Sequence, residues 1–191
     1  MAVASSGPAS RHRAHAATFT GLVDGTTDWD APAPVAGWRA RDVVDHLVTW
    51  LPGLLAADGV VLPAGPSADD DPAAAWRHHV GAVQAILDDP ATRDRTFTNR
   101  HVGELPLADA IDRFYTTDVF MHTWDLARAS GQPVALDDAE CAALLEGMEP
   151  IDDLLRSSGQ YGPRVPVPDD ASAMDRLVGF IGRDPVWQPA G

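Results

Sequence analysis

Apolar residues recur at helical spacing along most of this chain, and proline, glycine and aspartate separate the helical segments from one another. Alternation of apolar and polar residues, which is typical of a half-buried strand, is nearly absent, and we expect only a short strand around residues 96–98. The spacing predicts an all-α fold with helices over residues 8–24, 38–57, 72–87, 106–130, 137–156 and 172–182.

The chain has 191 residues, enough to bury one sizeable core, and its sequence contains no internal repeat. We expect one domain, in which residues 1–158 form a helical bundle and residues 159–191 pack on it as a proline-rich strap. Ser172 and Asp175 have the spacing of a capping box at the start of the last short helix. Pro52 lies inside the second predicted helix, which we expect to bend or break there.

Acidic residues outnumber basic ones by 28 to 14, so the formal net charge is −14. A protein that binds nucleic acid needs a cationic surface to displace counterions from phosphates, and this balance therefore argues against a nucleic-acid partner. An anionic membrane surface is disfavoured for the same reason. Because we find neither a signal-peptide core nor an uninterrupted apolar span, we expect a cytoplasmic protein without membrane segments.

The predicted helix over residues 106–130 places two titratable side chains on its apolar face. Asp118 and His122 lie about one turn apart within this face. Its apolar stripe consists of Ile111, Tyr115, Val119, Leu126 and Ala129. A buried carboxylate without a partner costs several kcal/mol, so something must compensate it. Two hypotheses are open: a structural hydrogen bond, from His122 or from another helix, and a divalent metal ion that both side chains bind.

His46, in the predicted helix over residues 38–57, is a candidate third ligand. It lies beside Trp50 at the edge of the apolar face, a position that suits a residue at the mouth of a cleft. A half-exposed surface histidine is the alternative interpretation. With Asp118 and His122 it would complete a set of two imidazoles and one carboxylate. Such a set leaves coordination positions open, as catalytic zinc and non-haem iron sites do.

The other histidines are not predicted ligands. His78 and His79 point about 100° apart on their helix, so they cannot both face one ion, and we expect at least one of them on the surface. His12 and His15, near the N-terminus, are expected to be solvated. His101 lies in a predicted loop, from which it could reach a cleft.

Asp125 has two interpretations: it hydrogen-bonds a ligand histidine, or it pairs with Arg128 or Arg183, and we favour the ion pair. Cys141 is the only cysteine, so the chain has no intrachain disulfide. We expect it to be a small buried side chain rather than a nucleophile, because no basic group lies near it in the sequence.

Four further side chains lie within the predicted helix over residues 38–57. Trp38 and Trp50 are expected to pack in the bundle. Arg39 and Arg41 are expected on the solvated surface, and attraction of an anionic thiol or carboxylate is the alternative role for them.

Three segments between Trp29 and Trp187 carry a family resemblance. They read WDAPAPVAGWRARDVVDHLVTW, DVFMHTWDLARASGQP and YGPRVPVPDDASAMDRLVGFIGRDPVW. The first two resemble the metal-binding helices of the DinB-like, mycothiol-dependent maleylpyruvate isomerase superfamily. The third resembles the C-terminal signature of an actinobacterial subgroup described only as metal-binding proteins. The H-T-W-D-L-A and G-R-D-P-x-W strings are the specific part of the match.

This resemblance implies a four-helix bundle that holds a divalent ion between one histidine of the second helix and an acidic-x-x-x-His or His-x-x-x-His pair of a later one. Matched residue by residue, these roles fall on His46, Asp118 and His122. We expect zinc in the first place, with nickel or iron as alternatives. Characterised members use a low-molecular-weight thiol, whose sulfur takes the open position of the ion and attacks an electrophilic substrate.

The implied function is that of a metal-dependent transferase or isomerase that uses mycothiol, with a small thiol and an electrophile as its partners. Two departures from the isomerases stand out. A strap replaces their separate C-terminal domain, and Asp118 replaces a glutamate. A non-catalytic metal-binding or interaction protein is the alternative, and a metal-free protein with a buried His–Asp network is a third hypothesis. No residue is predicted as a catalytic acid or base. A homodimer is expected only because homodimers are common among soluble proteins.

Overall fold

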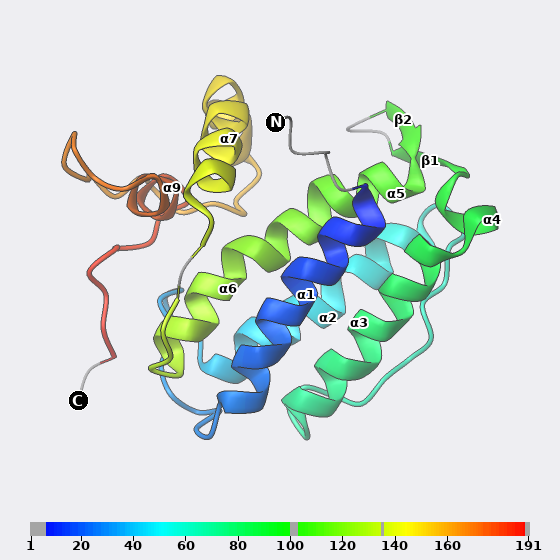
Figure 1. The fold of residues 1–191 in the computed structure, drawn as a ribbon, viewed down its shortest axis with the longest axis horizontal. Helices are drawn as coiled ribbons and strands as arrows, with labels where there is room; N and C mark the ends of the chain where they lie inside the picture. Colours follow the sequence, from blue (N-terminus) through cyan, green and yellow to red (C-terminus); the bar gives the residue numbers. More distant parts are fainter. Residues whose placement is uncertain (1–6, 100–102, 135, 190–191) are drawn as a thin grey trace.

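The computed structural model describes residues 7–99, 103–134 and 136–189. Three of its long segments are the helices α1 (Pro8–Gly25), α2 (Ala40–Ala56) and α3 (Pro72–Asp88), and Figure 1 shows them beside the fourth. The fourth consists of α5 (Leu107–Ala110), a π-helical turn (Ile111–Thr116) and α6 (Thr117–Ala129). Both α1 and α2 contact α3 and α6, so the four segments form a bundle and the all-α prediction is confirmed.

A short helix and a hairpin connect α3 to α5. The helix is α4 (Pro90–Arg93), and the hairpin pairs β1 (Thr96–Asn99) with β2 (Gly103–Pro106) in antiparallel register, Thr96 opposite Pro106. The strand expected around residues 96–98 is therefore present. Its partner was not predicted, because Gly-Glu-Leu-Pro contains two residues that disfavour strands and no apolar alternation.

Two prolines have opposite effects on the predicted helices. Of the two outcomes expected at Pro52, a bend or a break, the break is wrong, because α2 continues from Ala40 to Ala56 and buries Leu51 and Leu55 on either side of the proline. The predicted helix over residues 137–156 is divided, because Pro150 has no N–H to donate to the preceding turn. It becomes α7 (Asp138–Met148), a 3-10 turn (Glu149–Ile151) and α8 (Asp152–Ser157).

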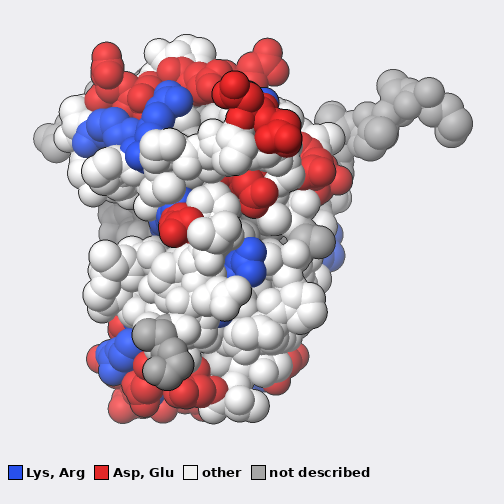
Figure 2. Space-filling model, turned by 90° about the vertical axis from the view of Figure 1, so that its left-hand side faces the viewer, with Lys and Arg blue, Asp and Glu red and all other residues white. Residues whose placement is uncertain are grey.

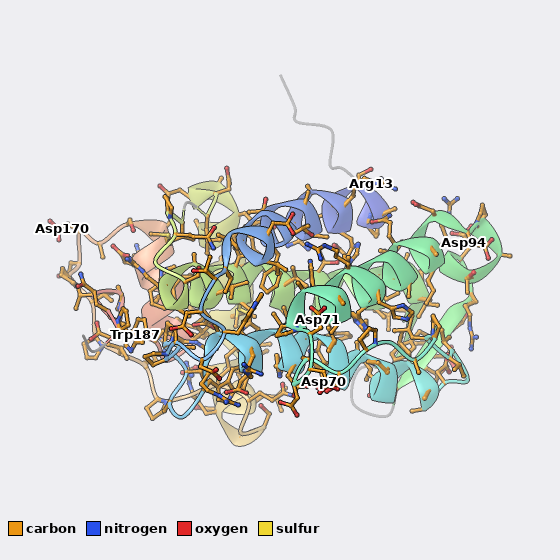
Figure 3. The ribbon with its side chains drawn as sticks, turned by 90° about the horizontal axis from the view of Figure 1, so that it is seen from below. Arg13, Asp70, Asp71, Asp94, Asp170 and Trp187 are labelled. Carbon is orange, nitrogen blue, oxygen red and sulfur yellow. The ribbon has the colours of Figure 1, made fainter. Side chains whose placement is uncertain are left out.

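Side-chain caps fix the beginnings of several helices, among them α3, α7 and α9 (Ala173–Phe180). Asp71 accepts a hydrogen bond of 2.9 Å from the backbone of Ala74 at the start of α3, where Figure 3 labels it. Asp137 accepts one of 2.8 Å at the start of α7. Ser172 accepts one of 3.0 Å from Asp175 at the start of α9, as the capping spacing predicts.

Buried apolar side chains form two clusters, and α6 contributes to both. The first cluster fills the bundle; its largest fully buried members include Phe19, Leu47, Leu51, Trp76 and Tyr115. The second joins one face of α6 to α7 and α9; its members include Phe120, Met121, Trp124, Cys141 and Leu177. Every residue from Val119 to Ala127 is buried, because α6 lies between the two clusters and packs against both.

We call α7, α8 and α9, with residues 158–172 and 181–189, the C-terminal layer. Figure 1 shows this layer at one end of the bundle, beside α6. The face of the molecule at this end has acidic side chains gathered at its top and bottom, in keeping with the net charge of −14 (Figure 2). Within the described residues, no helix has both the length and the apolarity needed to cross a membrane.

Candidate metal centre

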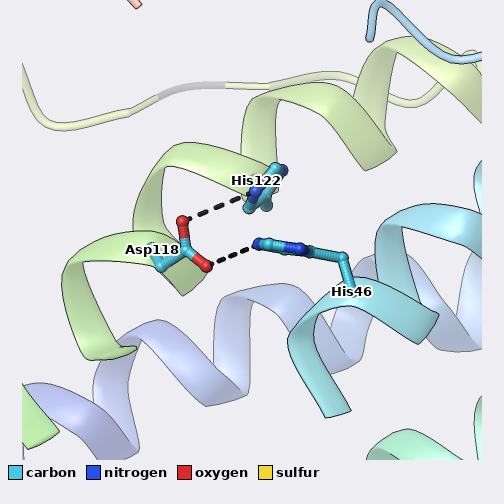
Figure 4. Close-up of side chains that lie close together, drawn as sticks. All are labelled: His46, Asp118 and His122. Carbon is cyan, nitrogen blue, oxygen red and sulfur yellow. Dashed lines mark hydrogen bonds and ion pairs between the residues drawn. The ribbon is translucent and has the colours of Figure 1, made fainter. Parts of the chain in front are cut away.

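The bundle brings the three predicted ligands together where α2 packs against α6. Nε2 of His46 lies 3.0 Å from Oδ2 of Asp118, and Nε2 of His122 lies 3.5 Å from Oδ1 of the same carboxylate (Figure 4). One nitrogen or oxygen from each residue falls within 4.8 Å of the others. Asp118 and His122 both lie in the regular part of α6, after the π-helical turn, so their i, i+4 spacing places them on one face.

The site is sheltered but open on one side. The side chain of His122 is 5% exposed, that of Asp118 is 18% exposed and that of His46 is 32% exposed. Burial raises the pKa of Asp118, but the charges of His122 and His46 and the hydrogen bonds it accepts lower that pKa overall. The carboxylate is therefore held ionised, which is the form that binds a cation.

Asp125 fixes the orientation of the His122 ring. Its Oδ2 lies 2.8 Å from Nδ1 of His122, and its own pKa is lowered, because hydrogen bonds from His122 and the charge of Arg183 outweigh the opposing effect of burial. An ionised carboxylate only accepts hydrogen bonds, so Nδ1 of His122 is the donor. In the neutral ring, Nε2 then carries a lone pair that faces Asp118.

Two acceptors that face each other repel unless something positive lies between them. Nε2 of His122 and Oδ1 of Asp118 are 3.5 Å apart. A proton on His122 satisfies this contact in the structural hypothesis, and a divalent cation satisfies it together with His46 in the metal hypothesis. The donor set of two imidazoles and one carboxylate fits zinc or a similar divalent metal, and a carboxylate behind a ligand histidine is the usual arrangement in zinc sites.

Two tryptophans, Trp38 and Trp50, pack against the apolar cluster of the bundle, as the sequence predicts, and they also contact the three side chains. Nε1 of Trp50 donates a hydrogen bond of 3.0 Å to Oδ2 of Asp118. The ring of Trp38 is stacked on His122 at 5.8 Å between centroids and lies 5.2 Å from the ring of His46. The i, i+4 spacing of His46 and Trp50 is the signal that could have placed Trp50 at the site.

The nearby arginines are engaged by acidic residues. Arg39 is exposed and pairs with Asp30 and Asp42, and Arg41 pairs with Asp30. Their charges are therefore largely balanced, and the alternative in which they attract an anionic substrate gains no support.

Two predictions about histidines near the N-terminus are wrong. His12 is fully buried, and its Nδ1 lies 2.9 Å from Oε1 of Gln84 on α3. His15 is mostly buried and lies 2.9 Å from Glu140 of α7. The cause is that α1 packs against α3 and α6 and that Arg11 and His15 contact Glu140 of α7, so proximity to the terminus does not bring exposure.

The remaining histidines and Cys141 follow the predictions where the structure describes them. His78 is exposed and His79 is buried, so one of the pair is on the surface as expected. His101 lies outside the described residues. Cys141 is fully buried, and burial with the neighbouring acidic charges raises the pKa of its thiol to about 12. It is therefore a packing residue rather than a nucleophile.

Both interpretations of Asp125 hold at once. It contacts the ring of His122, and it also pairs with Arg183, whose Nη2 lies 3.1 Å from Oδ2. Arg128, the other expected partner, instead lies over the ring of Trp124 at 5.3 Å.

Comparison with known proteins agrees with this arrangement. The model of the mycothiol maleylpyruvate isomerase N-terminal domain matches residues 11–127, which include all three candidate ligands. Two proteins of Mycobacterium tuberculosis, the uncharacterized proteins MT0763 of strain CDC 1551 and Rv0738 of strain H37Rv, are each 30% identical to the chain over 156 residues. The match covers 80% of this chain and 83% of each relative. No solved structure matches significantly. The chain belongs to the mycothiol maleylpyruvate isomerase N-terminal domain family.

Proposed function

We propose that the chain binds one divalent cation through His46, Asp118 and His122 and uses it to activate a low-molecular-weight thiol of the mycothiol type. The observation that carries this proposal is the position of His122 Nε2, which lies 3.5 Å from Oδ1 of Asp118 and beside the imidazole of His46. The name of the family supports the choice of thiol. We propose zinc first, and nickel or iron as alternatives.

A divalent ion bound there would lower the pKa of a coordinated thiol and could polarise a carbonyl of the substrate. The protein would contribute position and shelter. Asp125 holds the His122 ring, Trp50 holds the Asp118 carboxylate, and Trp38 covers both imidazoles on one side. The exposed part of His46 marks the side from which thiol and electrophile would enter.

The reaction we propose is transfer or isomerisation, in which the thiol adds to an electrophilic small molecule. The second candidate is a protein of the same fold that binds metal without turnover. Among the described contacts of the three ligands, the one further acid or base is Asp125, and it is engaged by His122 and Arg183, which favours this candidate. The two differ in one measurable respect, which is whether a small thiol reaches the ion.

The test uses Co²⁺ as an optical probe of the site. Co²⁺ added to the wild-type protein should give visible absorption at one equivalent, and a small thiol such as cysteine or N-acetylcysteine should add a near-ultraviolet thiolate band. His122→Ala should lose both signals, whereas His78→Ala, a substitution of an exposed histidine, should keep both. Metal absorption without a thiol band would overturn the thiol-using function and leave the binding protein.

A further inference from the structure

The two most specific sequence strings meet in one buried contact. Asp125 belongs to H-T-W-D-L-A on α6, and Arg183 belongs to G-R-D-P-x-W after α9. Nη2 of Arg183 lies 3.1 Å from Oδ2 of Asp125, and Nε lies 3.3 Å from Oδ1, so the guanidinium meets the carboxylate side-on with two hydrogen bonds. The Asp125 side chain is 1% exposed and that of Arg183 is 12% exposed. Such a contact fixes the plane of the carboxylate.

The plane of this carboxylate determines where the His122 ring points. Oδ2 of Asp125 accepts from Nη2 of Arg183 and also lies 2.8 Å from Nδ1 of His122. A chain of contacts therefore runs from the C-terminal layer, through α6, to a candidate metal ligand. Outer partners of this kind orient a ligand imidazole and affect metal affinity.

The backbone that carries Arg183 is itself fixed. Gly182 has a φ of +90°, and a Cβ at this position would lie 2.8 Å from Cα of Gly162, so a side chain is disfavoured on both counts. The N–H of Arg183 donates to the carbonyl of Val178 over 3.0 Å, which closes α9. Nη1 also donates to the carbonyl of Ile181 over 2.9 Å. The arginine is thus held in place independently of Asp125.

Contacts within the layer also hold the segment that precedes α9. Tyr161 packs against the second apolar cluster. Arg156 donates to the carbonyl oxygens of Gly162 and Phe180, which ties this segment to α9.

We propose that Arg183 is a positioning residue of the metal centre and that the C-terminal layer is thereby part of the site. This inference rests on the proposed metal-binding function. Arg183 contacts no candidate ligand directly; it acts by holding Asp125, which holds His122. Because the coupling is reciprocal, metal binding also stabilises the docked position of residues 181–183.

The test compares the Co²⁺ and Zn²⁺ dissociation constants of the wild type, Arg183→Met, Arg183→Lys and the control Arg176→Met, by competition with a chelator. Arg176 is an exposed arginine of α9. We expect Arg183→Met to weaken metal binding by about 10–100-fold, which is the usual effect of losing an outer partner. Arg183→Lys should restore only part of this loss, because an ammonium cannot meet the carboxylate side-on. Arg176→Met should bind like the wild type.

Adding Asp125→Asn to the comparison separates positioning from a general structural effect. If Arg183 acts through Asp125, Arg183→Met should cause much less additional loss of affinity in the Asp125→Asn background than in the wild type. Equal losses in both backgrounds, or wild-type affinity for Arg183→Met, would overturn the proposal.

A measurement on the metal-free protein distinguishes failure of the Arg183 proposal from failure of the proposed metal-binding function. Imidazole ¹⁵N NMR of the apo protein should show His122 protonated at Nδ1 in the wild type and a shifted, broadened signal in Arg183→Met. A wild type that binds no metal would overturn the proposed function. The NMR comparison would then still decide whether Arg183 positions the His122 ring, and an unchanged His122 signal would contradict it.

Discussion

The bundle and the C-terminal layer are held together by different means. The bundle buries long helices around a large apolar cluster, with polar groups confined to a few internal positions. The layer has shorter helices and a smaller cluster, to which α6 contributes Phe120, Met121 and Trp124. Its attachment also uses ion pairs, Arg11 with Glu140 and Arg183 with Asp125. The candidate metal centre therefore lies where the apolar bundle meets the ion pairs that attach the layer.

The largest effect should come from breaking the buried ion pair between the two regions. Asp125→Ala leaves Arg183 buried without its carboxylate, and we expect a loss of about 3–5 kcal/mol in the free energy of unfolding. Urea unfolding measures it. The matched surface substitution, Asp88→Ala, removes the exposed pair with Arg13 and should change stability little. A loss below about 1 kcal/mol for Asp125→Ala would show that apolar contacts alone attach the layer.

Truncation of one leucine in each cluster tests whether the regions unfold together. Leu51 in α2 and Leu177 in α9 are both fully buried, so each change to alanine should cost about 2–5 kcal/mol. Because α6 is shared, we expect a single transition in both variants, with the same midpoint by tryptophan fluorescence and circular dichroism. Two separate transitions for Leu177→Ala would show that the layer is an independent cooperative unit.

Between pH 7 and pH 5, acid should affect the bundle rather than the layer, since residues 131–191 contain no histidine. Burial and the charges of His12 and His78 lower the pKa of His79 from 6.5 to about 4. The unfolded chain therefore takes up the proton first, and stability falls as the pH drops from about 6.5 toward 4. Between pH 7 and pH 5 this histidine should account for about 2 kcal/mol of lost stability.

His79→Phe should therefore reduce the acid sensitivity of unfolding, measured as the difference between the unfolding free energies at the two pH values. His78→Gln changes the exposed neighbour on the same helix and should leave that difference as in the wild type. If His79→Phe loses as much stability on acidification as the wild type, another group is responsible.

The smallest signal is expected from Cys141, which reports on opening of the layer. With a thiol pKa of about 12, only about one molecule in ten thousand carries the thiolate at pH 8. Alkylation by iodoacetamide should therefore be very slow in the native protein and should follow global unfolding in urea. Labelling that precedes global unfolding would show that α7 separates from α6 before the bundle melts.

The sequence predicted the long helices well because each has a continuous apolar stripe, and it predicted His46, Asp118 and His122 as one set because spacing and motif agree. It could not predict β2, whose four residues lack a strand pattern. Burial of His12 depends on the packing of α3 and the C-terminal layer, which local periodicity does not contain. The contact of Asp125 with Arg183 joins residues 58 positions apart. From the sequence, this ion pair was one of two interpretations of Asp125, the other being a hydrogen bond to a ligand histidine.

The most direct test of the central claim is the metal content of protein purified without an affinity tag, measured by elemental analysis. Wild type is compared with His46→Ala, Asp118→Asn and the control His78→Ala. The account predicts close to one divalent metal per chain in the wild type and in His78→Ala, and a large loss in both ligand variants. A wild type that holds no metal, even after incubation with zinc, nickel or iron, would contradict it and leave a hydrogen-bonded His–Asp–His network.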